Sequence, residues 1–389
     1  MWYFCNNYGK KRPFWGKLAL QMLISDKKPA FIWIINNKGE IMNKLTKVGL
    51  SALAGSLAAV SAHAVDYAVT GDAQVVYSSA EGNEADSNTS NGRGIGVDTD
   101  LYFTAGGELD NGFTVSVFTA MDMEQSNTAT SGGLNSSAQL TIGMGSLGTV
   151  QFNDISGSAA NAIDDVLPKA YEETWDGTSH SSSFHSFGSS TQSGWIDYRL
   201  PALSLGDMSI SLTATLDPNS GSGPASAGGV GANDDAGQAY TAKISGMGLT
   251  LGGGYEEYAG NNSGSTEASD GTRATGYILY SNGPVSIGYQ EMYQDSPHSR
   301  SDAEGADVSG DGMAIAFSQD NLSVSYAEVN EIVEPNSDTT AEYEVEMSAL
   351  QATYTMGAMT LGMSLYETDN PEGTTGKYEE TELSVSFAF

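Results

Sequence analysis

The chain has 389 residues, with 48 acidic residues against 16 basic ones and a formal net charge of −32 at pH 7. A chain this acidic repels the phosphates of nucleic acids, so we exclude nucleic acid as a partner, while the same charge favours cations. Its one cysteine, Cys5, lies in an amino-terminal leader, so we expect neither disulfides nor cysteine catalysis in the rest of the chain.

The amino-terminal leader differs in composition from everything after it. From Met42 a basic start, an apolar stretch and a small-residue cleavage site at 62–64 follow one another, which is the pattern of a secretory signal. We therefore predict that 42–64 is a signal peptide. The preceding residues, 1–41, hold three of the five tryptophans and are interpreted as an extension from a mis-called start codon. A long signal sequence with an extended basic region is the alternative.

From Val65 onward the chain has a regular rhythm without a composition break. Stretches of about ten alternating residues are joined in turn by short turns and by long, acidic, Gly/Ser-rich loops. The expected strands are 65–79, 95–109, 113–125, 134–146, 148–156, 193–203, 208–217, 237–247, 249–259, 272–283, 284–296, 310–320, 321–332, 343–357, 358–370 and 377–389. An even number lets the first and last strands pair and close the sheet. We predict an all-β fold, a 16-stranded antiparallel transmembrane β-barrel with a water-filled lumen.

Alternation within the strands predicts which face meets lipid. Along 208–217, apolar side chains occupy one face and Ser, Thr and Asp the other. An ionic residue on the lipid face would cost about 2–4 kcal/mol at mid-membrane. Four charged residues have the opposite, inward parity: Asp122, Asp197, Arg199 and Lys243. The strand 343–357 breaks the pattern, because Val345 and Met347 are odd while Leu350 is even, and a β-bulge would restore it.

The last nine residues, 381–389, alternate apolar with small or polar side chains and end on an aromatic residue. Leu383, Val385, Phe387 and Phe389 share one face, which predicts an apolar outside and a polar inside. An ending of this kind is typical of a bacterial outer-membrane β-barrel.

The chain from 65 to 389 resembles the Gram-negative general-diffusion porins, particularly the alphaproteobacterial type. The segments that carry the resemblance are 69–73, 98–104, 111–117, the hairpin 144–152 and the terminal Phe389. It implies a homotrimer in the outer membrane of a Gram-negative bacterium, in contact with outer-membrane lipid and lipopolysaccharide, that passes ions and small hydrophilic solutes by diffusion. It also implies that the terminal strand, with Phe387 and Phe389, is the signal for the barrel-assembly machinery.

The resemblance further implies that the third external loop folds into the barrel and narrows it. Here the third long connection spans about 157–192, far longer than a turn needs, and long loops of this kind are usually functional. The candidates for the pore constriction are Asp164, Asp165, Lys169, Glu172, Glu173 and Asp176. Carboxylates in a narrow pore lower the energy of a passing cation, so we expect a cation-preferring channel.

The basic wall that faces this loop in related porins is depleted here. Arg199 and Lys243, which have inward parity, and Arg93 are the candidates for the opposing wall. A local salt bridge of Arg199 with Asp197 is the alternative interpretation.

Other chemistry is weakly indicated. Asp307, Ser309 and Asp311 precede a glycine as in the first half of a calcium loop, but position twelve is Ser318 instead of Glu. We keep these residues as a weak Ca²⁺ candidate and expect no required cofactor. His180 and His185 could bind a transition metal, although ordinary polar loop residues are the simpler interpretation.

The sequence lacks the Gly-x-Ser-x-Gly, Walker and His-Glu-x-x-His patterns, so we expect no enzymatic activity. Three alternatives to a diffusion channel stay open. They are a secreted or surface acidic Ca²⁺-binding β-protein, a barrel enzyme such as a lipase or protease, and a substrate-specific outer-membrane channel.

Overall fold

The computed structural model describes residues 66–82, 92–122, 135–154, 158–177, 187–188, 194–218, 236–258, 270–296, 306–335, 341–373 and 376–389. All of them lie in one compact unit, Ala64–Phe389. The predicted start extension, 1–41, and the predicted signal peptide, 42–64, lie outside the described residues and stay predictions. Among the described residues, no helix combines the length and apolar character needed to cross a membrane.

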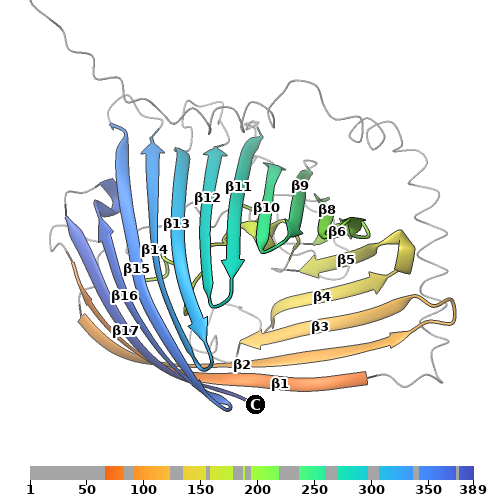
Figure 1. Ribbon diagram of the computed structural model, residues 1–389, viewed down its shortest axis with the longest axis horizontal. Coiled ribbons are helices and arrows are strands. Elements are labelled where there is room, and N and C mark those ends of the chain that lie inside the picture. Colours follow the sequence, from red (N-terminus) through yellow and green to blue (C-terminus); the bar gives the residue numbers. More distant parts are fainter. Residues whose placement is uncertain are drawn as a thin grey trace, which may run out of the picture. The chain divides into compact units, whose positions relative to one another are not determined.

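The described residues form a closed antiparallel sheet (Figure 1). Its strands are β1 (Asp66–Glu81), β2 (Gly92–Glu108), β3 (Thr114–Asp122), β4 (Asn135–Gly143), β5 (Thr149–Asp154), β6 (Trp195–Arg199), β7 (Leu203–Leu205), β8 (Met208–Asp217), β9 (Gly237–Gly246), β10 (Leu249–Tyr258), β11 (Gly271–Asn282), β12 (Val285–Asp295), β13 (Asp307–Gln319), β14 (Leu322–Glu334), β15 (Tyr343–Met356), β16 (Met359–Asp369) and β17 (Lys377–Ala388). Both β6 and β7 pair with β8, so they are two parts of one strand. Between them lies Pro201, which has no N–H to give to a ladder. The predicted 16-stranded antiparallel barrel is confirmed.

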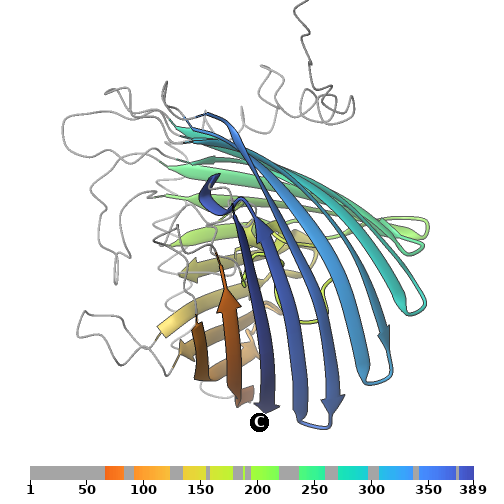
Figure 2. The ribbon, with the colours of Figure 1, turned by 90° about the vertical axis from the view of Figure 1, so that its left-hand side faces the viewer.

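Short turns and long connections alternate along the chain, and the short turns of the later strands gather at one end of the barrel (Figure 2). The turn between β9 and β10 consists of Met247 and Gly248, with φ of 54° and 79°. Positive φ at both central residues matches the right-handed twist of the flanking strands. These tight turns fix the register of each hairpin, and with it the face of every side chain.

The outer face of the barrel is apolar, as the alternation predicts. In β8, Leu212 and Leu216 are exposed on this face, whereas Thr215 and Asp217 are buried on the inner one. In β16, Leu361, Met363 and Leu365 are the exposed residues. In a membrane this band contacts hydrocarbon, while the polar inner face surrounds the lumen.

The predicted bulge in β15 is wrong. Each residue of Tyr343–Met356 pairs in continuous register with β14 or β16, and Val345 and Met347 face inward with 0% and 1% of their surface exposed. They pack with Val329 of β14 and with Leu167 of the third long connection. The inner face is therefore apolar at this place because the connection covers it.

The barrel closes where β17 meets β1. The last residue takes part, since Phe389 and Gly71 exchange two backbone hydrogen bonds of 2.8 Å. A Cβ atom on Gly71 would lie 2.6 Å from the carbonyl oxygen of Asp100 and 2.8 Å from the Phe389 ring. A glycine is needed here because any side chain would push the terminal residue out of the seam.

Candidate pore constriction

The third long connection joins β5 to β6, and its described part, 158–177, runs along inward-facing side chains of the barrel. Its path begins at Asp197 of β6, whose carboxylate accepts a hydrogen bond of 2.8 Å from the backbone N–H of Ala159. The same carboxylate accepts hydrogen bonds from Asn153 (2.9 Å) and Thr215 (2.5 Å) on the two neighbouring strands. Asp197 is thus a buried wall residue that holds the start of the loop.

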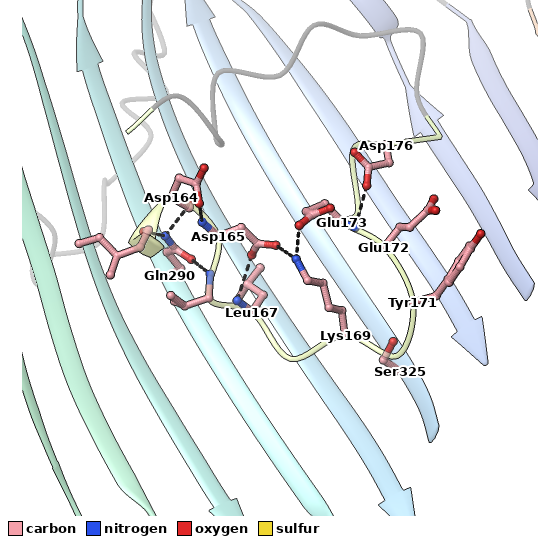
Figure 3. Close-up of polar contacts among 12 residues, drawn as sticks. Asp164, Asp165, Leu167, Lys169, Tyr171, Glu172, Glu173, Asp176, Gln290 and Ser325 are labelled. Atoms are coloured by element: carbon pink, nitrogen blue, oxygen red, sulfur yellow. Dashed lines mark hydrogen bonds and ion pairs between the residues drawn. The ribbon is translucent and has the colours of Figure 1, made fainter. Parts of the chain in front are cut away.

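Two glutamines hold the next part of the loop, and the first of them, Gln290, is shown in Figure 3. Gln290 of β12 accepts a hydrogen bond from the N–H of Val166 (3.0 Å) and donates to the carbonyl oxygens of Ile163 (3.1 Å) and Asp164 (2.9 Å). Further along, Gln351 of β15 binds the backbone of the loop in the same two-sided way. It accepts from the N–H of residue 171 (3.0 Å) and donates to the carbonyl oxygen of residue 172 (2.6 Å).

An apolar patch lies under the same segment. Leu167 and Trp175 of the loop pack on inward-facing side chains of four strands: Met292, Ala314, Ala327, Val329, Val345 and Met347. Burying these side chains against one another is worth about 25 cal/mol for each Å² removed from water. The loop is therefore held by apolar burial as well as by hydrogen bonds.

A short later piece, 187–188, is fixed to β10. Phe187 is fully buried, and a Cβ atom on Gly254 would lie 2.5 Å from its ring. The N–H of Gly188 donates to the carboxylate of Glu256 at 2.8 Å. Glu256 in turn lies 3.6 Å from Arg273, so this inward-facing arginine is occupied by a wall carboxylate.

The predicted constriction residues lie together on the described loop, but its one basic residue is neutralised locally. Lys169 Nζ lies 2.8 Å from Asp165 and also forms an ion pair with Glu173. The Asp164 carboxylate accepts hydrogen bonds from Asn161 Nδ2 (2.8 Å) and from the N–H of Asp165 (2.7 Å). Two acids thereby share one lysine, so this group of three side chains keeps an excess negative charge.

Two loop acids hold protons near neutral pH. Burial, together with the negative charges of Asp165 and Glu173, raises the pKa of Asp164 to about 7. Burial and a hydrogen bond shared with Glu173 raise the pKa of Asp176 to about 8. Burial acts upward on Glu173 too, but hydrogen bonds from Asp176 and Lys169 outweigh it and lower its pKa. Glu173 is therefore the charged partner of this carboxyl pair.

Glu172, the remaining predicted acid of the loop, lies beside β16. Its carboxylate accepts a hydrogen bond of 3.2 Å from the hydroxyl of Tyr366, an inward-facing residue that is almost fully buried. Tyr171, the residue before it, accepts a hydrogen bond of 2.6 Å from Gln74 of β1. The described loop thus reaches the wall on both sides of the seam between β17 and β1.

The three basic residues predicted for the opposing wall are not brought together. Arg199 faces inward and lies 3.4 Å from Asp197, which is the local salt bridge considered as the alternative. Lys243 lies on the inward face of β9 and is exposed. Arg93 is opposite Ser79 at the external end of β2, on the face of the exposed Ile95, which points away from the lumen.

Acidic residues line the wall at β1, β2 and β3 instead. Asp72, Asp100 and Asp122 lie directly opposite one another on the three adjacent strands and face inward. The carboxylates of Asp98, Asp100 and Asp122 lie within 4.8 Å of one another. Of these four aspartates only Asp122 is among the inward-facing residues predicted from the sequence, although alternation along β1 and β2 gives the other three the same inward parity.

The calcium candidates lie in an extended strand. Asp307, Ser309 and Asp311 are at the external end of β13, on the face that carries the exposed Met313 and Ile315. A 12-residue calcium loop must turn around its ion, which an extended strand does not do. Binding of Ca²⁺ there stays a prediction. The two histidines considered as metal ligands, His180 and His185, lie outside the described residues.

A closed antiparallel barrel that is apolar outside and polar inside is an integral β-barrel protein of the outer membrane. The family model of the Gram-negative porins matches residues 49–389, and the chain belongs to this family of outer-membrane channels. The resemblance inferred from the strand pattern and the terminal aromatic residue is thus confirmed at the level of the family. Its alphaproteobacterial subtype stays a prediction.

Solved porin structures share the fold at low sequence identity. A porin refined at 1.8 Å resolution is 15% identical, with a TM-score of 0.57 over 83% of this chain and 100% of that one. An anion-selective porin from Comamonas acidovorans is 11% identical, with a TM-score of 0.59 over 84% and 100%. The trimer form of OmpT from Vibrio cholerae is 9% identical, with a TM-score of 0.54 over 84% and 100%. No curated protein matches the sequence.

Proposed function

We propose that this porin forms a cation-preferring channel through which ions and small hydrophilic solutes diffuse. The observation that supports the preference is that acids line the lumen from two directions. Loop residues such as Asp164 and Glu172 contribute one group, and the aspartates of β1–β3, with Asp72 and Asp100, contribute the other. Carboxylates around a narrow water-filled path lower the energy of a cation and raise that of an anion.

The described basic residues of the inner face do little to oppose these acids. Lys169 is paired within the loop, Arg199 with Asp197 and Arg273 with Glu256. Among the described basic residues of the inner face, Lys243 is the exposed exception. Since an anion-selective porin shares the fold, the fold leaves the sign of selectivity to the side chains.

The assembly is proposed by analogy. One matched structure is described as a trimer, which supports a homotrimer for this chain. The apolar outer band would then contact both neighbouring subunits and the outer-membrane lipid, with lipopolysaccharide at the external side. We further propose that the barrel-assembly machinery recognises the strand that ends at Phe389.

The test is the reversal potential of single channels in a planar bilayer under a KCl gradient. The variant D164N/D165N/E172Q/E173Q should move the reversal potential toward zero. The matched control, E328Q/E344Q/E346Q/E367Q, replaces the same number of carboxyl groups on the outer face of β14–β16 and should leave the reversal potential unchanged. An anion-selective wild type, or equal shifts in both variants, would refute cation selection by the loop.

The same recordings test the calcium candidate. We propose that conduction needs no bound Ca²⁺, so a chelator should leave the conductance and reversal potential of the wild-type channel as they are. A loss of conductance that Ca²⁺ restores would assign a structural cation, and substitution of Asp307 and Asp311 would then show whether it binds at β13.

A further inference from the structure

We propose that Gln290 and Gln351 are the positioning residues of the constriction: they fix the acidic loop to the wall through uncharged hydrogen bonds, which add no positive charge beside its carboxylates. The positioning role stands on the contacts of the two glutamines. Its consequence for selectivity rests on the proposed cation preference.

Both amides lie at buried positions, and each uses its oxygen as an acceptor and its nitrogen as a donor. Gln290 and Gln351 expose 0% and 2% of their surface, and a buried amide must find partners for its N–H and C=O groups. The loop has the matching need, because its buried backbone groups lie outside any sheet ladder. Each glutamine meets it by accepting from one backbone N–H and donating to a nearby carbonyl. Gln290 also donates to Thr275 of β11, which fixes its own orientation.

The two glutamines hold opposite ends of one segment. Gln290 binds the backbone at 163–166, Gln351 binds it at 171–172, and Leu167 lies on the apolar patch between them. A serine adds a further hydrogen bond at the Gln351 end, where Ser325 Oγ accepts from the N–H of residue 170 at 2.8 Å. A segment attached at both ends has its side chains fixed in direction, which defines where the carboxylates point.

Glycines near the two glutamines let the loop approach the backbone of the barrel wall closely. Gly288 lies two residues before Gln290 on the same face, and a Cβ atom there would be 2.5 Å from Pro168 Cδ. Gly362 of β16 similarly lies under Tyr171, whose ring would be 3.0 Å from an added Cβ atom. The wall is therefore shaped to receive the loop at the level of the two glutamines.

The charge of the attaching residue matters as much as its reach. A lysine at either position could donate to the same carbonyls, but its ammonium would lie next to Asp164 or Glu172 and reduce the local negative charge. A glutamate would keep the acceptor and lose the donor. An amide provides both kinds of hydrogen bond and adds no charge, which suits a loop that must be firmly held and strongly acidic.

The experiment records single channels of the full protein with three changes. Gln290→Met with Gln351→Met keeps the side-chain volume and removes the hydrogen bonds. Gln290→Lys with Gln351→Lys adds charge at the same places. Gln139→Met is the matched control, since Gln139 faces the lumen from β4 and forms no hydrogen bond with the described part of the loop. Insertion and folding are checked by heat-modified migration on gels.

Without the amides, we expect brief closures and open-channel current noise to rise at least tenfold, while the control stays as quiet as the wild type. With lysines, we expect the cation-to-anion permeability ratio to fall at least fivefold. A methionine variant as quiet as the control would overturn the positioning role. If the double variant does not insert, we measure the single variants instead, each of which keeps one glutamine. They are compared with the same Gln139→Met control.

The two proposals fail in different ways. A wild-type channel that does not prefer cations would refute the proposed function, but the comparison of current noise between Gln351→Met and Gln139→Met would still decide the positioning role. Quiet methionine channels in a cation-preferring protein would refute the positioning role alone.

Discussion

The cation preference should depend on pH, because two loop acids ionise near neutrality. The pKa values of Asp164 and Asp176 are raised to about 7 and about 8. Near pH 6 both are mostly protonated, and by pH 9 both are mostly charged. Because the charged forms attract cations, the cation-to-anion permeability ratio should rise with pH across this window. Below pH 6 these two groups should contribute little further change.

The size of the effect follows from simple electrostatics. A carboxylate about 5 Å from a monovalent ion in a water-like medium interacts with it by about 0.8 kcal/mol. At 0.1 M salt the screening length is about 10 Å, which reduces this to about 0.5 kcal/mol. The carboxylate stabilises a cation and destabilises an anion by this amount, a difference of about 1 kcal/mol. We therefore expect about a fivefold change in the permeability ratio for each ionising residue.

The assay is the reversal potential in a KCl gradient, measured in half-unit steps from pH 6 to pH 9. Wild type is compared with D164N/D176N, which should stay at the low-pH ratio throughout. Histidines titrate in the same range, so any slope left in the double variant measures them. A flat wild-type profile, or an equal slope in both proteins, would show that these acids do not act on passing ions.

Three further outcomes are expected. Replacing Lys169 by Met frees the two carboxylates that it pairs, so the cation-to-anion ratio should rise several-fold; an unchanged reversal potential would mean that these groups do not face the ion path. Leu212→Arg puts a charge on the lipid face and should lower the free energy of unfolding, measured with urea in lipid vesicles, by about 2–4 kcal/mol, while Ser211→Arg on the inner face should cost much less. Deleting Phe389 should reduce the amount of folded protein in outer-membrane fractions, whereas Phe389→Tyr should not; normal levels of the truncated protein would contradict a role in assembly.

The positions of the strands could be predicted from the sequence, because the alternation of apolar and polar residues is a local property. Predicted strand ends lie within about three residues of the structure for nearly every strand. The main difference is at 193–203, where Pro201 divides the predicted strand into β6 and the short β7. Parity also assigned Asp197, Arg199 and Lys243 correctly to the inner face.

The place where the third long connection attaches to the wall could not be predicted from the sequence, because it depends on contacts between residues far apart in the chain. Gln290 and Gln351 lie more than a hundred residues from the loop positions that they bind. One signal was present nevertheless. Val345 and Met347 are apolar although they have inward parity. A β-bulge is one explanation of this pattern, but a loop that covers the inner face explains it without any change of register.

The contact between Phe389 and Gly71 has a consequence for biogenesis. In the described sheet, β1 and β17 are the neighbours that are farthest apart in the chain, and their ladder includes the carboxyl-terminal residue itself. The earlier hairpins can form without β17, but the ring cannot close until β17 pairs with β1. Until then the free edge of β1 and the free edge of the most recently added strand are open to pairing with other chains.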